Sequence, residues 1–403
     1  MNGARTRGHP TALAAIGAMV RGGAPGAVLL VGPGGIGKTT LATDLAAGLL
    51  CGNADLAARP DGTCRACRLV LHGTHPDVHR LGPEGPGRQV VIGGPGKPRG
   101  IRDLIGELAL LPVEGGARVA IIEAAHRMNE DAQAALLKTL EEPPARTTII
   151  LCADAEEPLL PTIRSRCARL RLGPVAVRDI EAILTELAVA DAPLGARLAR
   201  IADGRPGLAL AWARQPDALR ERDALGRALL DLAVARPADR LRGIRAIAAQ
   251  AIALTAVTES TSAVDGPTSR ARGGKAARPP AAADAEATVE DGSGDDQGAA
   301  EEAATSIKTP ATERRRAAES VLALWTDVAR DLALYQRGLE RSVRDLARLD
   351  DTRTLAAELD REALTTFLDR LGRATVLLAT NVSPELLLDD LALAWPRPRT
   401  QAA

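Results

Sequence analysis

The sequence predicts an α/β domain with a parallel sheet, followed by all-helical domains. Three observations support this fold class. Short apolar runs alternate with helical patterns over residues 1–172, a glycine-rich loop follows the first run, and only helical periodicity is found beyond residue 173. Strands that are apolar along their whole length and are joined by helices are typical of parallel sheets covered on both faces.

The first domain, residues 1–172, is expected to contain five strands and four helices in alternation. The predicted strands are Ala27–Val31, Val78–Leu81, Val119–Ile122, Thr148–Ala153 and Ala168–Leu172. The helical patterns between them cover Lys38–Leu50, Ile101–Leu111, Glu130–Glu142 and Leu159–Arg164. Each strand is followed by a helix long enough to cross over the sheet, which favours parallel pairing.

The remainder of the chain is expected to be helical, with one interruption. Residues 173–214 predict a lid of three helices, Val177–Val189, Pro193–Ala202 and Pro206–Arg214. A second helical domain is expected from residues 215–254 and 321–400, with later helices at Val321–Leu349, Thr352–Arg373 and Pro384–Trp395. Residues 255–320 contain no leucine and no aromatic residue, and their composition predicts a disordered insertion.

The composition excludes several classes of function. The chain has 51 basic and 51 acidic residues and only three Trp, one Tyr and one Phe, which argues against a free-standing binder of nucleic acid. No signal peptide and no apolar run of membrane-spanning length is found. The five cysteines fit a reducing compartment better than a disulfide framework, so we expect a cytoplasmic protein.

A phosphate-binding loop is predicted after the first strand. Residues 32–39, Gly-Pro-Gly-Gly-Ile-Gly-Lys-Thr, satisfy the pattern G-x-x-x-x-G-K-[ST] between a strand and a helix. Backbone N–H groups at the start of that helix would surround a phosphate, Lys38 would reach the β- and γ-phosphates, and the Thr39 hydroxyl would bind Mg²⁺. The expected ligand is ATP with Mg²⁺, and the residues expected to bind it are Gly32, Gly35, Gly37, Lys38, Thr39 and Thr40.

Hydrolysis by this loop requires a second acidic residue after a neighbouring strand. The strand that ends at Ile122 is followed by Glu123 and Ala124. Glu123 could bind the metal ion, but Ala124 cannot serve as the base for the attacking water, a role that contributes on the order of 10²–10⁴ in rate. We therefore expect weak or absent hydrolysis, although the sequence leaves open whether nucleotide binds.

Several segments together resemble the bacterial sliding-clamp loader family, which are AAA+ proteins of the DNA polymerase III holoenzyme. The resemblance rests on Gly73–Asp77, on His126–Asn129, on the run from Ala134 to Pro144 that reads AALLKTLEEPP, and on Leu160–Cys167 with its Ser-Arg-Cys sequence. It covers about residues 9–214 and implies an AAA+ domain with a helical lid. The later helices are compatible with the family's collar domain by pattern alone.

The resemblance implies one of two types of subunit. Motor subunits (gamma and tau) carry Asp-Glu after the third strand, a polar sensor residue near the position of Ala153, and a sensor arginine at the position of Gly207. This chain lacks all three, which favours the stator type (delta-prime), a subunit that is not expected to be a catalyst alone. An ATP-hydrolysing motor subunit and a P-loop kinase remain the alternatives.

In this family the arginine of Ser-Arg-Cys is an arginine finger, which maps to Arg166. The resemblance implies that Arg166 projects into the ATP site of a neighbouring subunit, where a guanidinium neutralises charge that develops on the γ-phosphate. It also implies the partners: the gamma/tau and delta subunits in a hetero-pentamer, the sliding clamp, and primed DNA within the complex.

A cysteine module is expected at residues 51–72. The family binds Zn²⁺ with four cysteines, and the matching positions here are Cys51, Asp61, Cys64 and Cys67. Three thiolates and a carboxylate can form a tetrahedral zinc site, although one that is weaker than four thiolates. His72 is an alternative fourth ligand.

Overall fold

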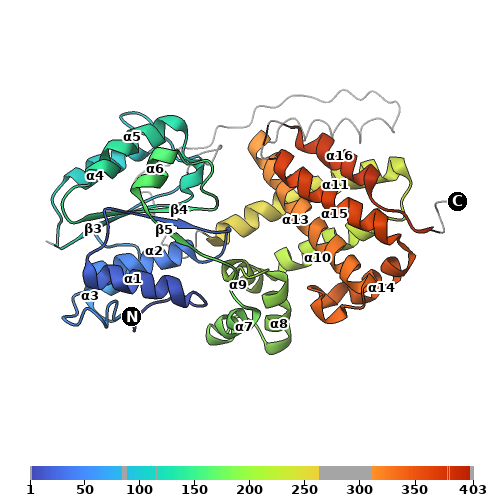
Figure 1. Cartoon of the computed structure of the whole chain (residues 1–403), viewed down its shortest axis with the longest axis horizontal. Helices are drawn as coiled ribbons and strands as arrows, with labels where there is room; N and C mark the ends of the chain where they lie inside the picture. Colours follow the sequence, from blue (N-terminus) through green and yellow to red (C-terminus); the bar gives the residue numbers. More distant parts are fainter. Residues whose placement is uncertain are drawn as a thin grey trace, which may run out of the picture.

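The computed structural model describes residues 2–83, 89–114, 116–262, 310–378, 380 and 382–399. Figure 1 shows a sheet domain at the N-terminal end, a small helical lid below the middle of the view, and a larger helical domain that ends at the C-terminus. We call the larger domain the collar. Among the described residues, no helix is both long enough and apolar enough to cross a membrane.

The sheet domain is built on five parallel strands in the order β2-β3-β4-β1-β5. Their bounds are β1 Ala27–Val31, β2 Val78–Leu81, β3 Arg118–Ile122, β4 Thr147–Ala153 and β5 Ala168–Arg171. All five predicted strands are therefore present, with ends that differ from the prediction by one residue at most. This order, with a phosphate loop after β1, confirms the AAA+ fold class.

Two layers of helices cover the sheet, one on each face (Figure 1). Side chains alternate along each strand: Leu29 of β1 packs toward one layer and Leu30 toward the other. One layer contains α1 Pro10–Gly22, α2 Lys38–Leu50 and α3 Arg65–Leu71. The other contains α4 Ile101–Ala109, α5 Glu130–Glu141 and α6 Pro161–Arg166, with the short 3₁₀ turn η1 Ala125–Arg127 before α5.

In the described part of the chain, the lid and the collar are built from helices, and they share one apolar cluster. The lid helices are α7 Val177–Glu186, α8 Ala192–Ile201 and α9 Pro206–Arg214. The collar contains α10 Pro216–Asp231, α11 Pro237–Ser262, α13 Ala311–Gln336, η2 Glu340–Ser342, η3 Leu346–Arg348, α14 Leu349–Glu358, α15 Arg361–Leu378 and α16 Pro384–Ala394.

Aromatic residues are concentrated at the centre of the collar. The ring centroids of Trp325, Phe367 and Trp395 lie 4.6–5.6 Å apart, in tilted and edge-on pairs. These three residues come from α13, from α15 and from the end of α16, and the indole of Trp395 also donates to the Leu229 carbonyl of α10 at 3.1 Å. Three of the five aromatic residues of the chain thus hold four collar segments together.

Three sequence predictions about the collar are wrong. The segment predicted to be one helix from 321 to 349 is α13 followed by short turns, because Gly338 adopts a positive φ of 72° after α13 ends. The pattern at 352–373 is divided between α14 and α15, because Asp360 accepts hydrogen bonds from the backbone of Glu362 and Ala363 and so begins a new helix.

The third error concerns the insertion. Residues 255–320 were expected to be disordered, but α11 extends to Ser262 and α13 begins at Ala311. The absence of leucine was misleading, since alanine is the strongest helix former and the buried side chains of Ala317 and Ala318 allow close packing. The central part of the predicted insertion, residues 263–309, lies outside the described residues.

A buried ionic cluster joins the lid to the collar. Its centre is Asp345, which is 1% exposed and accepts hydrogen bonds from Arg197 of α8 at 3.1 Å and from Arg222 of α10 at 3.0 Å. The guanidinium of Arg348 lies 3.1 Å from the same carboxylate. Burial alone would raise the pKa of Asp345, but these three guanidinium groups more than offset it and hold the pKa below its usual value.

We predict that Asp345→Asn lowers the free energy of unfolding by about 3–5 kcal/mol, because the buried guanidinium groups of Arg222 and Arg348 and the half-buried one of Arg197 lose their shared carboxylate. The matched control is Asp217→Asn. Asp217 pairs with Arg220 on the surface, and its side chain is 91% exposed, so the change should stay within about 0.5 kcal/mol. Urea denaturation followed by circular dichroism measures both variants, and equal shifts would contradict the prediction.

Candidate functional site

The phosphate loop connects β1 to α2 at the carboxyl edge of the sheet. Two of its glycines have positive φ angles, 76° at Gly35 and 107° at Gly37, which side chains rarely adopt. Gly32 is constrained differently, because a Cβ atom there would lie 2.5 Å from the Leu172 carbonyl oxygen. The loop therefore requires glycine at these three positions, and Gly37 places the first N–H groups of α2 at the loop.

Lys38, the first residue of α2, donates hydrogen bonds to three oxygen atoms of the protein. Its side chain is 8% exposed. Its Nζ atom donates to the carbonyl oxygens of Gly32 at 2.6 Å and Pro33 at 2.9 Å, and to Asp154 Oδ1 at 2.7 Å. Thr39 and Thr40 follow it, both half-buried. The loop and its lysine are thus present, and the binding of Mg²⁺ by the Thr39 hydroxyl stays a prediction.

The predicted metal-binding acid lies beside a cation. Glu123 follows β3, and its Oε1 atom lies 3.4 Å from Nη1 of Arg80, a β2 residue. The other terminal nitrogen of Arg80 donates to Thr43 of α2 at 2.7 Å, so the arginine bridges Glu123 to the helix that begins at the phosphate loop. Ala124 has a left-handed backbone with φ 49°, and it offers no acid or base at this position.

The lid contacts the phosphate loop through backbone atoms. The Gly207 N–H of α9 donates to the Gly35 carbonyl at 2.8 Å, and a Cβ atom at Gly207 would lie 2.9 Å from that carbonyl oxygen. A sensor arginine at position 207 would have to push the two segments apart. The nearby Arg205 donates to the Ala202 carbonyl. Burial lowers its pKa, and its acidic neighbours are Asp203 and Asp327 in the lid and the collar.

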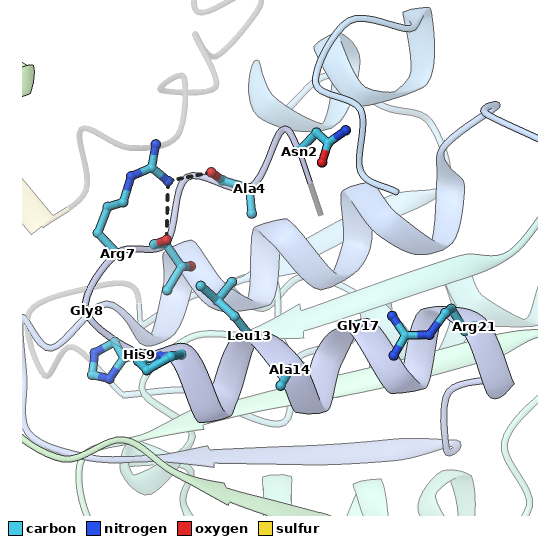
Figure 2. Close-up of a pocket in the computed structure, with 11 residues that line it drawn as sticks. Asn2, Ala4, Arg7, Gly8, His9, Leu13, Ala14, Gly17 and Arg21 are labelled. Carbon is cyan, nitrogen blue, oxygen red and sulfur yellow. Dashed lines mark hydrogen bonds between the residues drawn. The ribbon is translucent and has the colours of Figure 1, made fainter. Parts of the chain in front are cut away.

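The N-terminal segment also reaches the phosphate loop. His9 Nε2 lies 2.9 Å from the Ile36 carbonyl oxygen. Arg5 and Thr6 precede His9 in the sequence and bind to α2. The buried Asp44 of α2 accepts hydrogen bonds from the backbone of Arg5 and from both the backbone and the hydroxyl of Thr6. Thr6 and His9 also line an open pocket of about 700 Å³. Figure 2 shows the pocket between this segment and α1, with Arg7 hydrogen-bonded to Ala4.

A second hollow, of about 350 Å³, lies at the carboxyl edge of the sheet. It is bordered by Gly32 of the phosphate loop, by Asp154 and by Glu157. Asp154 is not among the residues predicted from the sequence. Its position directly after β4, beside β1 and β3, could have identified it, since the carboxyl ends of parallel strands meet at one edge.

The candidate arginine finger lies on the layer of helices opposite α2. Arg166 ends α6, and its side chain is 34% exposed. One terminal nitrogen donates to the Thr162 carbonyl at 2.9 Å and the other to Glu141 of α5 at 2.5 Å. Because Glu141 belongs to the LLKTLEEPP segment, the two most specific motifs of the sequence contact each other. The two helices are also tied by Gln133 of α5, whose side-chain oxygen accepts from the Leu160 N–H.

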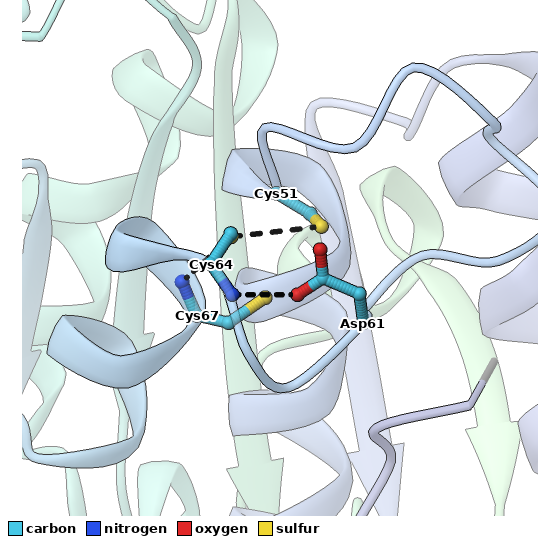
Figure 3. Close-up of side chains that lie close together, drawn as sticks. All are labelled: Cys51, Asp61, Cys64 and Cys67. Carbon is cyan, nitrogen blue, oxygen red and sulfur yellow. Dashed lines mark hydrogen bonds between the residues drawn. The ribbon is translucent and has the colours of Figure 1, made fainter.

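The cysteine module brings four potential ligands together (Figure 3). One ligand atom each from Cys51, Asp61, Cys64 and Cys67 lies within 4.8 Å of all the others. The Cys51 and Cys64 sulfurs are 3.9 Å apart, close to the roughly 3.8 Å expected between thiolates bound 2.3 Å from one zinc ion in a tetrahedral site. His72 instead follows α3, and this cluster of described residues does not include it.

Local backbone geometry positions these ligands. Cys51 follows the last turn of α2, and Cys64 begins α3, where its sulfur accepts from the Cys67 N–H. Hydrogen bonds from the N–H groups of Cys64 and then Thr63 lower the pKa of Asp61 to about 2, so it is a carboxylate at neutral pH. Burial raises the pKa of Cys67. A cation bound here would stabilise the deprotonated form of Cys67 against this effect of burial.

The segment Gly73–Asp77 is structural. The buried Asp77 carboxylate accepts from the N–H groups of Val113 at 2.7 Å and Glu114 at 3.0 Å, and His75 Nδ1 accepts from the Asp77 N–H. The segment therefore fixes the approach to β3. The other two cysteines, Cys152 and Cys167, are buried in the sheet domain, and burial raises the pKa of Cys152 to about 12.

Comparisons with known proteins agree with the motifs. The sequence model of the family described as "DNA polymerase III, delta subunit" matches residues 14–176. The DNA polymerase III subunit delta' of Pseudomonas aeruginosa is 43% identical over 143 residues, which is 36% of this chain and 42% of that protein. The Escherichia coli subunit delta' is 37% identical over 204 residues, covering 50% of this chain and 58% of that protein.

Relatives named subunit tau match with lower identity than these two delta' subunits. The tau subunit of Escherichia coli is 34% identical over 183 residues, which is 44% of this chain and 27% of that protein. The chain spans about half the length of the delta' relatives that it matches. The resemblance predicted from the motifs is confirmed over residues 14–176, which match the sequence model of the DNA polymerase III delta-subunit family.

Proposed function

We propose that the chain is the delta-prime (stator) subunit of a bacterial DNA polymerase III clamp loader. In this role it lies beside a gamma/tau motor subunit, supplies Arg166 to the ATP site of that subunit, and supports ATP-dependent loading of the sliding clamp on primed DNA. The delta subunit completes the assembly, in which the collar helices join the subunits. The reducing, cytoplasmic location expected from the cysteines is part of this proposal, and in the structure all five are free.

The observation that carries the proposal is Ala124 at the end of β3, beside a complete phosphate loop. ATP hydrolysis requires a base or a polar residue that orients the attacking water. Ala124 has no such group, and Gly207 of the lid occupies the sensor position with a backbone contact to Gly35. The phosphate loop therefore retains residues that can bind phosphate. At positions 124 and 207, the chain has no side chain that could activate water or sense the γ-phosphate.

A second observation supports a role in trans. Arg166 and the phosphate loop lie on different sides of the molecule, since α6 and α2 cover opposite faces of the sheet (Figure 1). The guanidinium is partly exposed, and Glu141 and Thr162 fix its orientation. A side chain held in this way loses little conformational entropy when it meets a phosphate on another subunit.

We also propose that the cysteine module binds Zn²⁺ through Cys51, Asp61, Cys64 and Cys67. A zinc ion there would fix the end of α2 to the start of α3, since Cys51 follows one helix and Cys64 precedes the other. This is a structural role, because all four ligands come from the protein and none of the coordination positions is left for a substrate.

Two alternatives remain. A motor subunit is favoured by the 34% identity with the tau relative and by the intact Lys38, and it predicts ATP hydrolysis by the purified chain alone. A P-loop kinase is favoured by the phosphate loop alone, and it predicts transfer of phosphate to a nucleotide acceptor. Neither alternative accounts for Ala124 together with the contact between Arg166 and Glu141.

We predict that Arg166→Ala lowers ATP turnover of the reconstituted clamp loader at least about tenfold, because an arginine finger is worth 10³–10⁵ in rate in other NTPases. Arg166→Lys should restore little of it, since a lysine lacks the planar fork that holds both Glu141 and a phosphate. Steady-state hydrolysis in the presence of clamp and primed DNA measures the effect.

The matched control for Arg166 is Arg169→Ala. Arg169 is a half-exposed arginine of β5 that pairs with Glu156 at 3.6 Å, and its removal should leave turnover within about twofold, because it lies outside the contact with Glu141. Size-exclusion chromatography shows whether each variant still assembles. Unchanged turnover by a fully assembled Arg166→Ala complex would contradict the proposed role.

We predict one zinc ion per chain and a stronger site in Asp61→Cys, because four thiolates bind zinc more tightly than three thiolates and a carboxylate. Asp61→Ala should weaken binding at least about tenfold, whereas Asp55→Ala in the same loop and His72→Ala should not. Elemental analysis after dialysis against a chelator measures the retained metal. Equal retention by the Asp61→Ala and Asp55→Ala variants would show that Asp61 is not a ligand.

A further inference from the structure

We propose that Asp154 is an internal competitor for the phosphate site: its carboxylate occupies Lys38 and must be displaced before a nucleoside triphosphate can bind. This inference rests on the nucleotide site of the proposed function and identifies the residue that sets its affinity for phosphate. It does not depend on the role of Arg166 in the assembled complex.

The argument starts from the three N–H donors of a lysine ammonium group. Two donors of Lys38 go to the carbonyl oxygens of Gly32 and Pro33, within the loop itself. The third goes to Asp154 Oδ1 at 2.7 Å. A phosphate oxygen that approaches Lys38 therefore needs the donor that Asp154 now occupies.

The two partners differ in their exposure to water. The Lys38 side chain is 8% exposed, so its charge requires a partner, whereas the Asp154 side chain is 45% exposed and can turn into solvent. Removing the carboxylate from Lys38 has a free-energy cost, and a bound phosphate has to offset it. The ion pair thus lowers the apparent affinity for a triphosphate without blocking the loop permanently.

The backbone at Asp154 is fixed independently of its carboxylate. The Asp154 N–H donates to Nδ1 of His126 at 3.1 Å, and His126 Nε2 lies 3.8 Å from Asp154 Oδ2. Burial lowers the pKa of His126, so its ring is neutral at neutral pH and offers the carboxylate no competing full charge. The side chain can then move away while the end of β4 remains in place.

The surroundings of Asp154 also oppose an anionic ligand. The hollow of about 350 Å³ beside Gly32 is lined by Asp154, Glu156 and Glu157. Arg171, the arginine in its lining, already pairs with Glu156. Asp154 pairs with Lys38 and Glu156 with Arg169 and Arg171, whereas Glu157 has no ion-pair partner among the described residues. A triphosphate entering from this side therefore meets the negative charge of Glu157 in addition to the occupation of Lys38.

The test is nucleotide binding by the full chain, measured by isothermal titration calorimetry with Mg·ATP, inorganic triphosphate and adenosine. We expect Asp154→Ala to bind Mg·ATP and triphosphate about tenfold or more tightly than the unmodified chain, with Asp154→Asn in between because an amide oxygen still accepts from Lys38. Adenosine has no phosphate, so the change should not alter its binding. Adding Lys38→Ala to Asp154→Ala should remove the gain.

The matched control is Glu157→Gln, which removes one negative charge from the same hollow at an exposed residue with no bond to Lys38. It should change affinity less than about threefold. Equal gains from Asp154→Ala and Glu157→Gln would overturn the proposal and leave only long-range charge. No gain in a folded Asp154→Ala chain, or no binding by any variant, would also overturn it.

These outcomes are separate from those of the proposed function. If Asp154→Ala does not raise the affinity for Mg·ATP, the proposed trans role of Arg166 is not affected, because that role is measured as ATP turnover by the assembled complex. Conversely, if Arg166→Ala does not change ATP turnover by the assembled complex, the competition at Lys38 can still be measured in the isolated chain. Thermal unfolding of each Asp154 variant, expected within a few degrees of the unmodified chain, shows that the fold is retained.

Discussion

The order of the parallel sheet is the constraint on which the rest of the structure depends. Because β1 lies between β4 and β5, and β3 lies on the other side of β4, the carboxyl ends of these strands meet at one edge. This edge places Lys38, Glu123 and Asp154 in one neighbourhood, although they are far apart in the sequence. Strand order alone thus determines which side chains can compete for a phosphate.

The same architecture separates the two proposed sites within one domain. The helix that begins at the phosphate loop covers one face of the sheet, and the helix that carries Arg166 covers the other. A chain can therefore lose hydrolysis at its own site while it keeps a rigid arginine for a neighbour. The lid and the collar are joined by the buried carboxylate of Asp345 and by a shared apolar cluster.

Much of the fold was predictable from the sequence because its signals are local. Apolar runs located every strand within one residue, and the phosphate motif located α2. The collar was less predictable, since helix ends there depend on single residues such as Gly338 and Asp360. The helical start of α13 was missed because its buried face uses small alanines instead of leucines.

The candidate sites show a similar division. The resemblance to the clamp-loader family was enough to propose Cys51, Asp61, Cys64 and Cys67 as one set, and the structure brings their ligand atoms together. Spacing could not show that Arg80 would lie beside Glu123 or that Asp154 would hold Lys38, because both contacts join separate strands or strand ends. Such partners become visible only when the strand order is known.

The most direct test of the central claim is single-turnover hydrolysis of ATP by the purified chain, measured with and without a gamma/tau motor subunit. The account predicts no hydrolysis above the uncatalysed background for the chain alone, and hydrolysis only when the motor subunit is present. Hydrolysis by the isolated chain that Lys38→Ala abolishes would contradict it, because the chain would then possess a water-activating group that Ala124 does not provide.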